Sequence, residues 1–210
     1  MAYDLEEQEQ LDEIKAWWKR YGNWALTAVT VVAVSIAAIQ GWKSYQYKQS
    51  AQASVIFQEL IQANDQDVKN IQTKSAQLIE NYASTAYAGR AALLAAKVNY
   101  QAKDVKSAKA QLEWASKNAK ESAVVAMALL QLAGIQFEEK NYDAALKTLD
   151  EKRAAGFAGL FADLKGDVLI AQGKKAEAKI AYELALKTLD AEGSYAQYTK
   201  YKLEALGDDA

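Results

Sequence analysis

The chain has 210 residues, 25 of them basic and 27 acidic, so it lacks the basic excess expected of a protein that binds nucleic acid. It contains no histidine and no cysteine, which excludes disulfides, thiolate nucleophiles, Ser-His-Asp catalysis and nearly every transition-metal site. Carboxylate pairs such as Glu138-Glu139 have the spacing of a solvated helix face. We therefore expect a protein that is not an enzyme, with no catalytic residue, cofactor or metal centre.

The first predicted element is a membrane-spanning helix from Tyr21 to Trp42. This segment carries no charge, although 25% of the chain's residues are charged. At about 1.5 Å per residue it forms a helix of roughly 33 Å, which matches a hydrocarbon core of about 30 Å. Tryptophan, tyrosine and lysine residues flank both ends, as is typical of anchored transmembrane helices.

A cleaved signal peptide is the alternative interpretation, because the span lies near the N-terminus. Residues 1–20 are acidic, however, and the small-x-small site Ser35-Ile36-Ala37 lies inside the apolar run. We therefore expect an uncleaved signal anchor. The cations near the span are Lys15, Lys19 and Arg20 before it, then Lys43 and Lys48 after it. This slight excess favours a cytoplasmic segment 1–20 and, in a bacterial inner membrane, a periplasmic domain after the span.

Small residues recur every four positions within the span. Ala33, Ala37 and Gly41 give one narrow helix face, which would allow another membrane helix to approach closely. Chance placement in an alanine-rich span explains the same pattern equally well.

A helical hairpin is expected next, over residues 43–83. The segment 44–63 keeps helical periodicity, so the membrane helix is expected to continue into the domain. The polar turn 64–67 is followed by a second amphipathic helix over 68–81. Since the chain has no proline, we expect the whole domain to be helical.

A period of about 34 residues covers residues 84–192 and predicts three tetratricopeptide-like helix pairs, 89–122, 126–158 and 159–192. In this repeat, a small residue in the first helix allows an alanine of the second helix to pack closely. The first role falls to Ala96, Ala133 and Gly166, and the second to Ala108, Ala145 and Ala178. The alternative is an alanine-rich helical bundle with accidental periodicity.

The last segment, 193–210, is predicted to hold a capping helix and an acidic tail. Its expected apolar side consists of Tyr195, Tyr198, Tyr201, Leu203 and Leu206. Such a helix would cover the open face of the last repeat.

The concave side of a repeat array is lined by the first helix of each pair. The register predicts a partner-binding groove there, formed by Arg90, Leu93, Lys97, Tyr100, Met127, Leu130, Phe137, Leu160, Asp163 and Asp167. A mixed apolar and charged groove suits an extended or helical peptide of another protein. The apolar members serve equally well as core between repeats, so the charged ones are the better candidates. Reversing Arg90 and Lys97 to Glu is predicted to weaken partner capture.

Three stretches carry a resemblance to a known family: LDEIKAWWKRYGN at the membrane entry, Gly41-Trp42 at its end, and AALKTLDEKRAAGFAGLFADLKGDVLIAQGKKAEAKIAYELAL. Over nearly its whole length the chain resembles the bacterial YfgM family. This resemblance implies an inner-membrane ancillary subunit of the SecYEG translocon, with a periplasmic repeat domain and the membrane-anchored chaperone PpiD as a partner. It also implies contact between residues 1–20 and a cytoplasmic stress-response regulator, although that segment has no recognisable binding motif.

The expected function is therefore that of a non-enzymatic adaptor or accessory chaperone. The anchor would hold the groove beside the translocon exit, where translocating polypeptides pass to periplasmic chaperones. The alternative is a tetratricopeptide-repeat scaffold of another cell-envelope complex, such as one for division or cell-wall synthesis.

Overall fold

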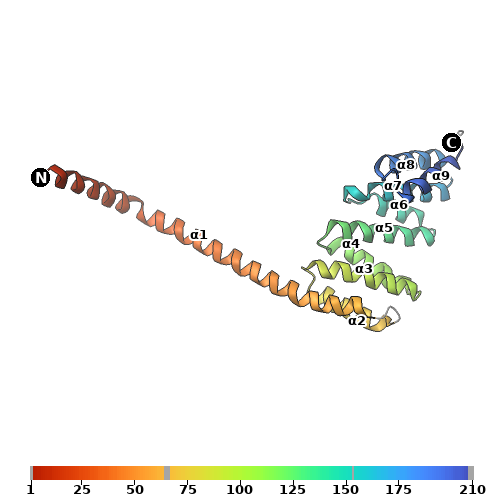
Figure 1. Ribbon diagram of the computed structural model, residues 1–210, viewed down its shortest axis with the longest axis horizontal. Coiled ribbons are helices and arrows are strands. Elements are labelled where there is room, and N and C mark those ends of the chain that lie inside the picture. The colour runs from red at the N-terminus through yellow and green to blue at the C-terminus, as the bar shows by residue number, and fades with distance from the viewer. Residues whose placement is uncertain (1, 64–66, 153, 208–210) are drawn as a thin grey trace. The chain divides into compact units, whose positions relative to one another are not determined.

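The computed structural model describes residues 2–63, 67–152 and 154–207, and these are helical without a strand (Figure 1). Its elements are α1 (Ala2–Gln62), α2 (Val68–Asn81), α3 (Ala86–Gln101), α4 (Val105–Asn118), α5 (Ser122–Glu138), α6 (Tyr142–Leu149), the 3-10 turn η1 (Ala155–Phe157), α7 (Ala158–Ala171), α8 (Lys175–Thr188) and α9 (Ser194–Glu204). The chain divides into two compact units, Met1–Lys48 and Gln49–Ala210. The predicted all-α fold is confirmed.

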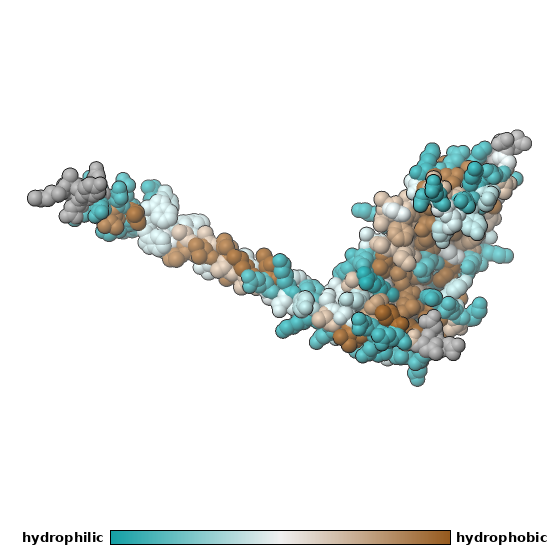
Figure 2. All heavy atoms as spheres, viewed as in Figure 1, coloured by the Kyte–Doolittle hydropathy of each residue, from teal (hydrophilic) through white to brown (hydrophobic). Residues whose placement is uncertain are grey.

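The first unit contains the candidate membrane span, within α1. Figure 2 shows a hydrophobic band along the middle of this helix, between more polar ends. The side chains of the band are exposed. The hydroxyls of Thr27, Thr30 and Ser35 donate to carbonyl oxygens four residues earlier, at 2.7, 2.8 and 2.8 Å. These three hydroxyls are thus satisfied within the helix, as a lipid environment requires.

The second unit begins with the last turns of α1, which pack with α2 and α3. Ala53 and Leu60 of α1 are buried in one cluster with Ile71 and Leu78 of α2 and with Val98 of α3. Burial of these side chains removes apolar surface from water, which is the main force that holds the hairpin on the repeats. The end of the long helix is therefore part of the repeat domain's core.

The three following helix pairs, α3 with α4, α5 with α6, and α7 with α8, share one turn geometry. The turn residues Lys103, Lys140 and Gly173 have positive φ, at 66°, 60° and 78°. In each turn the next residue donates its amide to a carbonyl five positions back, as Asp104 does to Asn99 at 2.9 Å. This is the closing bond of a Schellman motif. Three equal turns indicate true repeats rather than an accidental alanine pattern.

The small residues predicted at the helix crossings lie at those crossings. Ala96, Ala133, Ala108, Ala145 and Ala178 are all buried, at 0 or 1% exposure. Gly166 is also buried, and a Cβ atom there would lie 2.3 Å from Cε1 of Tyr182. The helices of the third pair thus approach more closely than a side chain on residue 166 would allow. The fold is the predicted tetratricopeptide-like solenoid.

The orientation of α9 differs from the expectation. Tyr195, Tyr198 and Tyr201, predicted to face the last repeat, are between 61 and 67% exposed. The buried residues are instead Ala196 and Thr199. The prediction of a tyrosine face was therefore wrong, whereas Leu203 and Leu206 do pack against the last repeat.

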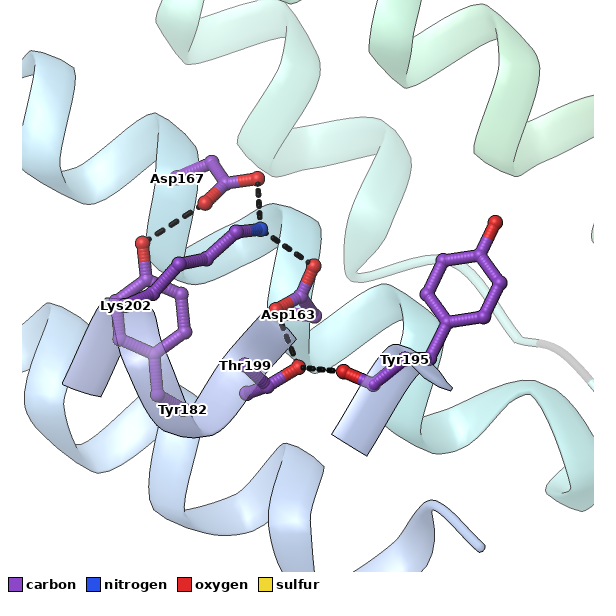
Figure 3. A network of polar contacts seen from close by, with 6 residues as sticks. All are labelled: Asp163, Asp167, Tyr182, Tyr195, Thr199 and Lys202. Carbon is purple, nitrogen blue, oxygen red and sulfur yellow. Dashed lines mark hydrogen bonds and ion pairs between the residues drawn. The ribbon is translucent and has the colours of Figure 1, made fainter. Parts of the chain in front are cut away.

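A polar network accounts for this rotation of α9. Lys202 and Thr199 of α9 bind the carboxylates of Asp163 and Asp167 on α7 (Figure 3). These bonds hold the face of α9 that carries Thr199 and Lys202 against α7, and the three tyrosines lie outside that face. The polar side of α9 therefore turns inward.

Candidate functional site

A groove lies between α3 and α5, with a volume of about 700 Å³. It brings together five of the residues predicted from the register: Arg90, Leu93, Lys97, Tyr100 and Met127. Leu112 of α4 is buried at its floor, and Met127 is exposed at its wall. Apolar surface next to charged side chains also suits a peptide segment of another protein.

Sequence reasoning missed the α5 residues Gln131, Gly134 and Glu138, which line the groove with Met127. Positions 127, 131, 134 and 138 are spaced 4, 3 and 4 residues apart, so they share one helix face. Extending the helical spacing from the predicted residue Met127 would have identified these three residues from the sequence.

Two predicted groove residues on α5 lie elsewhere. Leu130 and Phe137 pack against the core of the second repeat, beside Phe161 and Leu149. The ring of Phe137 lies 6.0 Å from the ring of Tyr142, centroid to centroid. These two side chains stabilise the stacking of the helix pairs and do not line the groove.

Arg90 stands at one end of the groove, bound to Glu121. Its Nε and Nη2 atoms donate to the two carboxylate oxygens of Glu121 at 2.7 and 2.6 Å. This bidentate hydrogen bond raises the pKa of Arg90 and lowers the pKa of Glu121 relative to their ordinary values. The charge of Arg90 is thus balanced within the chain, which leaves it less available to a partner.

Lys97 is the cation in the groove with the greatest freedom to meet a partner. Its side chain is exposed, and no described residue forms an ion pair or hydrogen bond with it. At the other end, the hydroxyl of Tyr100 donates to Glu138 and links α3 to α5. This hydrogen bond raises the pKa of Tyr100. The groove therefore offers one unpaired positive charge beside apolar walls.

The two predicted acidic residues lie under α9. Lys202 Nζ lies 2.8 Å from Asp163 Oδ2 and 2.7 Å from Asp167 Oδ2. The Tyr182 hydroxyl donates to Asp167 Oδ1 at 2.8 Å, and the Thr199 hydroxyl lies 2.7 Å from Asp163 Oδ1 (Figure 3). The carboxylates are 14 and 26% exposed. They bind the chain's own capping helix, and Leu160, one turn earlier on α7, is half-buried.

The pKa values of this network follow from its burial and charges. Burial raises the pKa of Tyr182, and the hydrogen bond to Asp167 raises it further. Burial alone would lower the pKa of Lys202, but its hydrogen bonds to Asp163 and Asp167 outweigh this and raise it overall. Lys202 is therefore positively charged at neutral pH, and its ion pairs with Asp163 and Asp167 hold α9 against α7.

The described residues offer no further constellation with evident chemistry. Among them, no group of three or more acidic side chains is placed to hold a metal ion. In the span, Ala33, Ala37 and Gly41 are exposed on α1, and a Cβ on Gly41 would meet nothing within 4 Å. Packing of this face against another membrane helix stays a prediction.

Comparison with known proteins places the chain in a family. The profile of the tetratricopeptide repeat-like domain matches residues 15–208. A protein of Neisseria gonorrhoeae is 30% identical over 208 residues, which cover 98% of this chain and 100% of the relative. A protein of Haemophilus influenzae is 31% identical over 88% of this chain and 91% of the relative. A third, from Escherichia coli, is 28% identical over 87% of this chain and 88% of the relative.

Each of these three relatives is named an ancillary SecYEG translocon subunit. The likeness extends over the span as well as the repeats, because nearly the whole chain is matched. The chain belongs to the YfgM family of tetratricopeptide repeat-like proteins.

Proposed function

We propose that this protein is a non-enzymatic adaptor of the SecYEG translocon, anchored in the bacterial inner membrane by the span in α1. The names of its relatives support the association with the translocon. The observation that carries the adaptor role is the open groove between α3 and α5, in which an unpaired Lys97 lies beside apolar walls. It binds segments of other proteins and performs no chemistry on them.

In this proposal the groove receives translocating polypeptides and passes them to a PpiD-like chaperone. Exposed Met127 provides a flexible, polarisable contact that adapts to different side chains. The ammonium group of Lys97 orients a bound segment by attracting the carboxylates of that segment. Tethering raises the effective concentration of the groove for anything that leaves the translocon, so weak contacts suffice.

The proposed topology has a cytoplasmic N-terminus and a periplasmic repeat domain. The chain has no cysteine, so single introduced thiols report topology without background. Lys117→Cys on α4 is expected to react with a membrane-impermeant maleimide in spheroplasts, and Gln10→Cys only after the membrane is permeabilised. The opposite pattern would reverse the topology. Contact between residues 1–20 and a stress-response regulator stays a prediction.

Photocrosslinking in intact cells tests the adaptor role. A photoreactive residue at position 97 is expected to crosslink to Sec subunits, to a PpiD-like chaperone or to translocating chains. The same residue at position 117, which is exposed on α4 and outside the groove, is the matched control. Adducts only with division or cell-wall proteins would replace the translocon role by the envelope-scaffold alternative.

Charge reversal gives a second test of the groove itself. Lys97→Glu is preferable to Arg90→Glu, because reversing Arg90 would also break its ion pair with Glu121. We expect Lys97→Glu to reduce the crosslinks formed from position 127, with Lys117→Glu as the control. Equal crosslinking in the two variants would remove the groove from the proposal.

A further inference from the structure

The second helix of the middle repeat ends early and leaves a cleft beside α8. Helix α6 has 8 residues, whereas its counterparts α4 and α8 each have 14. A cleft of about 310 Å³ opens between α6, α7 and α8. Its floor includes buried Phe161 and Leu169, and its outer wall is formed by Ile180 and Leu184 of α8. The missing turns of α6 would occupy part of this space in a regular repeat.

The exposed face of α8 carries an ordered stripe of side chains. Ile180 and Leu184 are 68 and 50% exposed, which is high for large aliphatic residues. Glu177 precedes them and Lys187 follows them, at spacings of 3, 4 and 3 residues, so the four share one helix face. Within the described part of the chain, neither Glu177 nor Lys187 has an ion pair or a hydrogen bond.

The stripe on one α8 helix is complementary to the same stripe on a second α8 helix that runs in the opposite direction. In an antiparallel pair of α8 helices centred on residue 182, Ile180 faces Leu184 of the other copy. In the same register, Glu177 faces Lys187 of the other copy. Apolar centres with opposite charges at both ends are the pattern that sets pairing and direction in antiparallel helix pairs. An isologous contact of this kind requires the same patch on both copies.

We propose that the cleft and the α8 stripe form a docking surface for a second copy of this chain. Each copy inserts its Ile180 and Leu184 toward the cleft that the short α6 leaves open in the other. The aliphatic surface is small compared with the roughly 1,200 Å² buried by stable interfaces. The contact is therefore weak in solution and forms between copies held in one membrane. It is separate from the groove between α3 and α5, and of the proposed function it rests only on the membrane anchor.

Charge exchange tests the pairing in lipid vesicles that contain the full chain. Donor and acceptor dyes on Lys117→Cys report association by energy transfer. Glu177→Lys sets like charges against each other at both ends of the pair and is expected to weaken association about tenfold. Lys187→Glu is expected to do the same, and Glu177→Lys with Lys187→Glu together should restore association.

Disulfide formation tests the direction of the pair. Ile180→Cys in one copy and Leu184→Cys in the other should join when the two variants are mixed. Lys175→Cys is the control, because its two copies would lie about 21 Å apart along antiparallel helices. Energy transfer that is unchanged by either reversal, or not restored by the double exchange, overturns the proposal. Efficient Lys175→Cys dimers also overturn it, since they would require parallel helices.

Discussion

Gly166→Ala should destabilise the third repeat, even though alanine favours helices. The glycine lies within α7, where the helix crosses α8. An added Cβ would meet three ring carbons of Tyr182, at 2.3, 2.6 and 2.8 Å. Ordinary contacts of this kind lie near 3.5 to 4.0 Å, so the ring would have to move by about 1 Å. Tyr182 is buried and donates its hydroxyl to Asp167, so it has no free direction in which to move.

The expected magnitude follows from three opposing terms. Overpacking of a closed core costs about 1–3 kcal/mol. Loss of the hydrogen bond to a charged carboxylate costs about 1.5–3 kcal/mol. Replacing glycine by alanine in a helix interior stabilises the helix by about 1 kcal/mol. We expect a net loss of about 3 kcal/mol in the free energy of unfolding, or roughly 6 to 12 °C in Tm for a domain of this size.

Urea titration of the full chain in detergent, followed by circular dichroism, measures this loss. Gly134→Ala on α5 is the matched control, because a Cβ there would meet nothing within 4 Å. It should stabilise the protein by about 0.5–1 kcal/mol. Adding Tyr182→Leu to Gly166→Ala removes the obstructing ring, so the two losses should be less than additive. Equal stability of the two glycine variants would refute the close-approach argument.

Three further substitutions test other parts of the domain by the same titration. Leu60→Ala should cost about 2–5 kcal/mol, because Leu60 is buried in the hairpin core. Ile61→Ala is the control and should cost little, because Ile61 is exposed. Equal losses of stability in the two variants would place the end of α1 outside the domain core. Lys202→Met should cost about 1–3 kcal/mol by leaving two shielded carboxylates without their cation. Because the pKa of Lys202 is raised, its contribution to the free energy of unfolding is present below pH 10.5 and is lost as pH rises through the folded pKa. A stability difference between the native chain and Lys202→Met that stays constant up to pH 12 would contradict this. Asp104 accepts the Ser107 amide at 3.1 Å, and its pKa is lowered by its hydrogen bonds to Ser107. The contribution of Asp104 to stability is therefore present above pH 3.8 and is lost as pH falls through the folded pKa. Asp104→Asn should remove this dependence on acid, while its amide oxygen still caps α4.

The candidate site was partly predictable from the repeat register. Leu93 and Lys97 lie in the groove because their helix face follows from the crossing residue Ala96. Leu130 and Phe137 were placed there wrongly, since an apolar residue at a helix edge fits the groove and the core equally well in sequence. The choice depends on the angle at which α5 packs on α7, and no local pattern encodes it.

Pairings between distant residues were not predictable. Arg90 is bound by Glu121, 31 residues later, and Asp163 by Lys202, 39 residues later. A chain with 52 charged residues offers many such combinations. Only the folded backbone selects the few that meet, and these selections decided which charges of the predicted groove remain open to a partner.

By itself, the sequence determined the candidate membrane span and the repeat architecture. An uncharged run long enough to cross a bilayer needs no tertiary partner to be recognised. The crossing alanines and Gly166 fix the period, because only small residues permit close helix contact. The tertiary structure decided how α9 is rotated and where α6 ends. The rotation of α9 depends on its hydrogen bonds to α7, which exist only when the two helices are in contact.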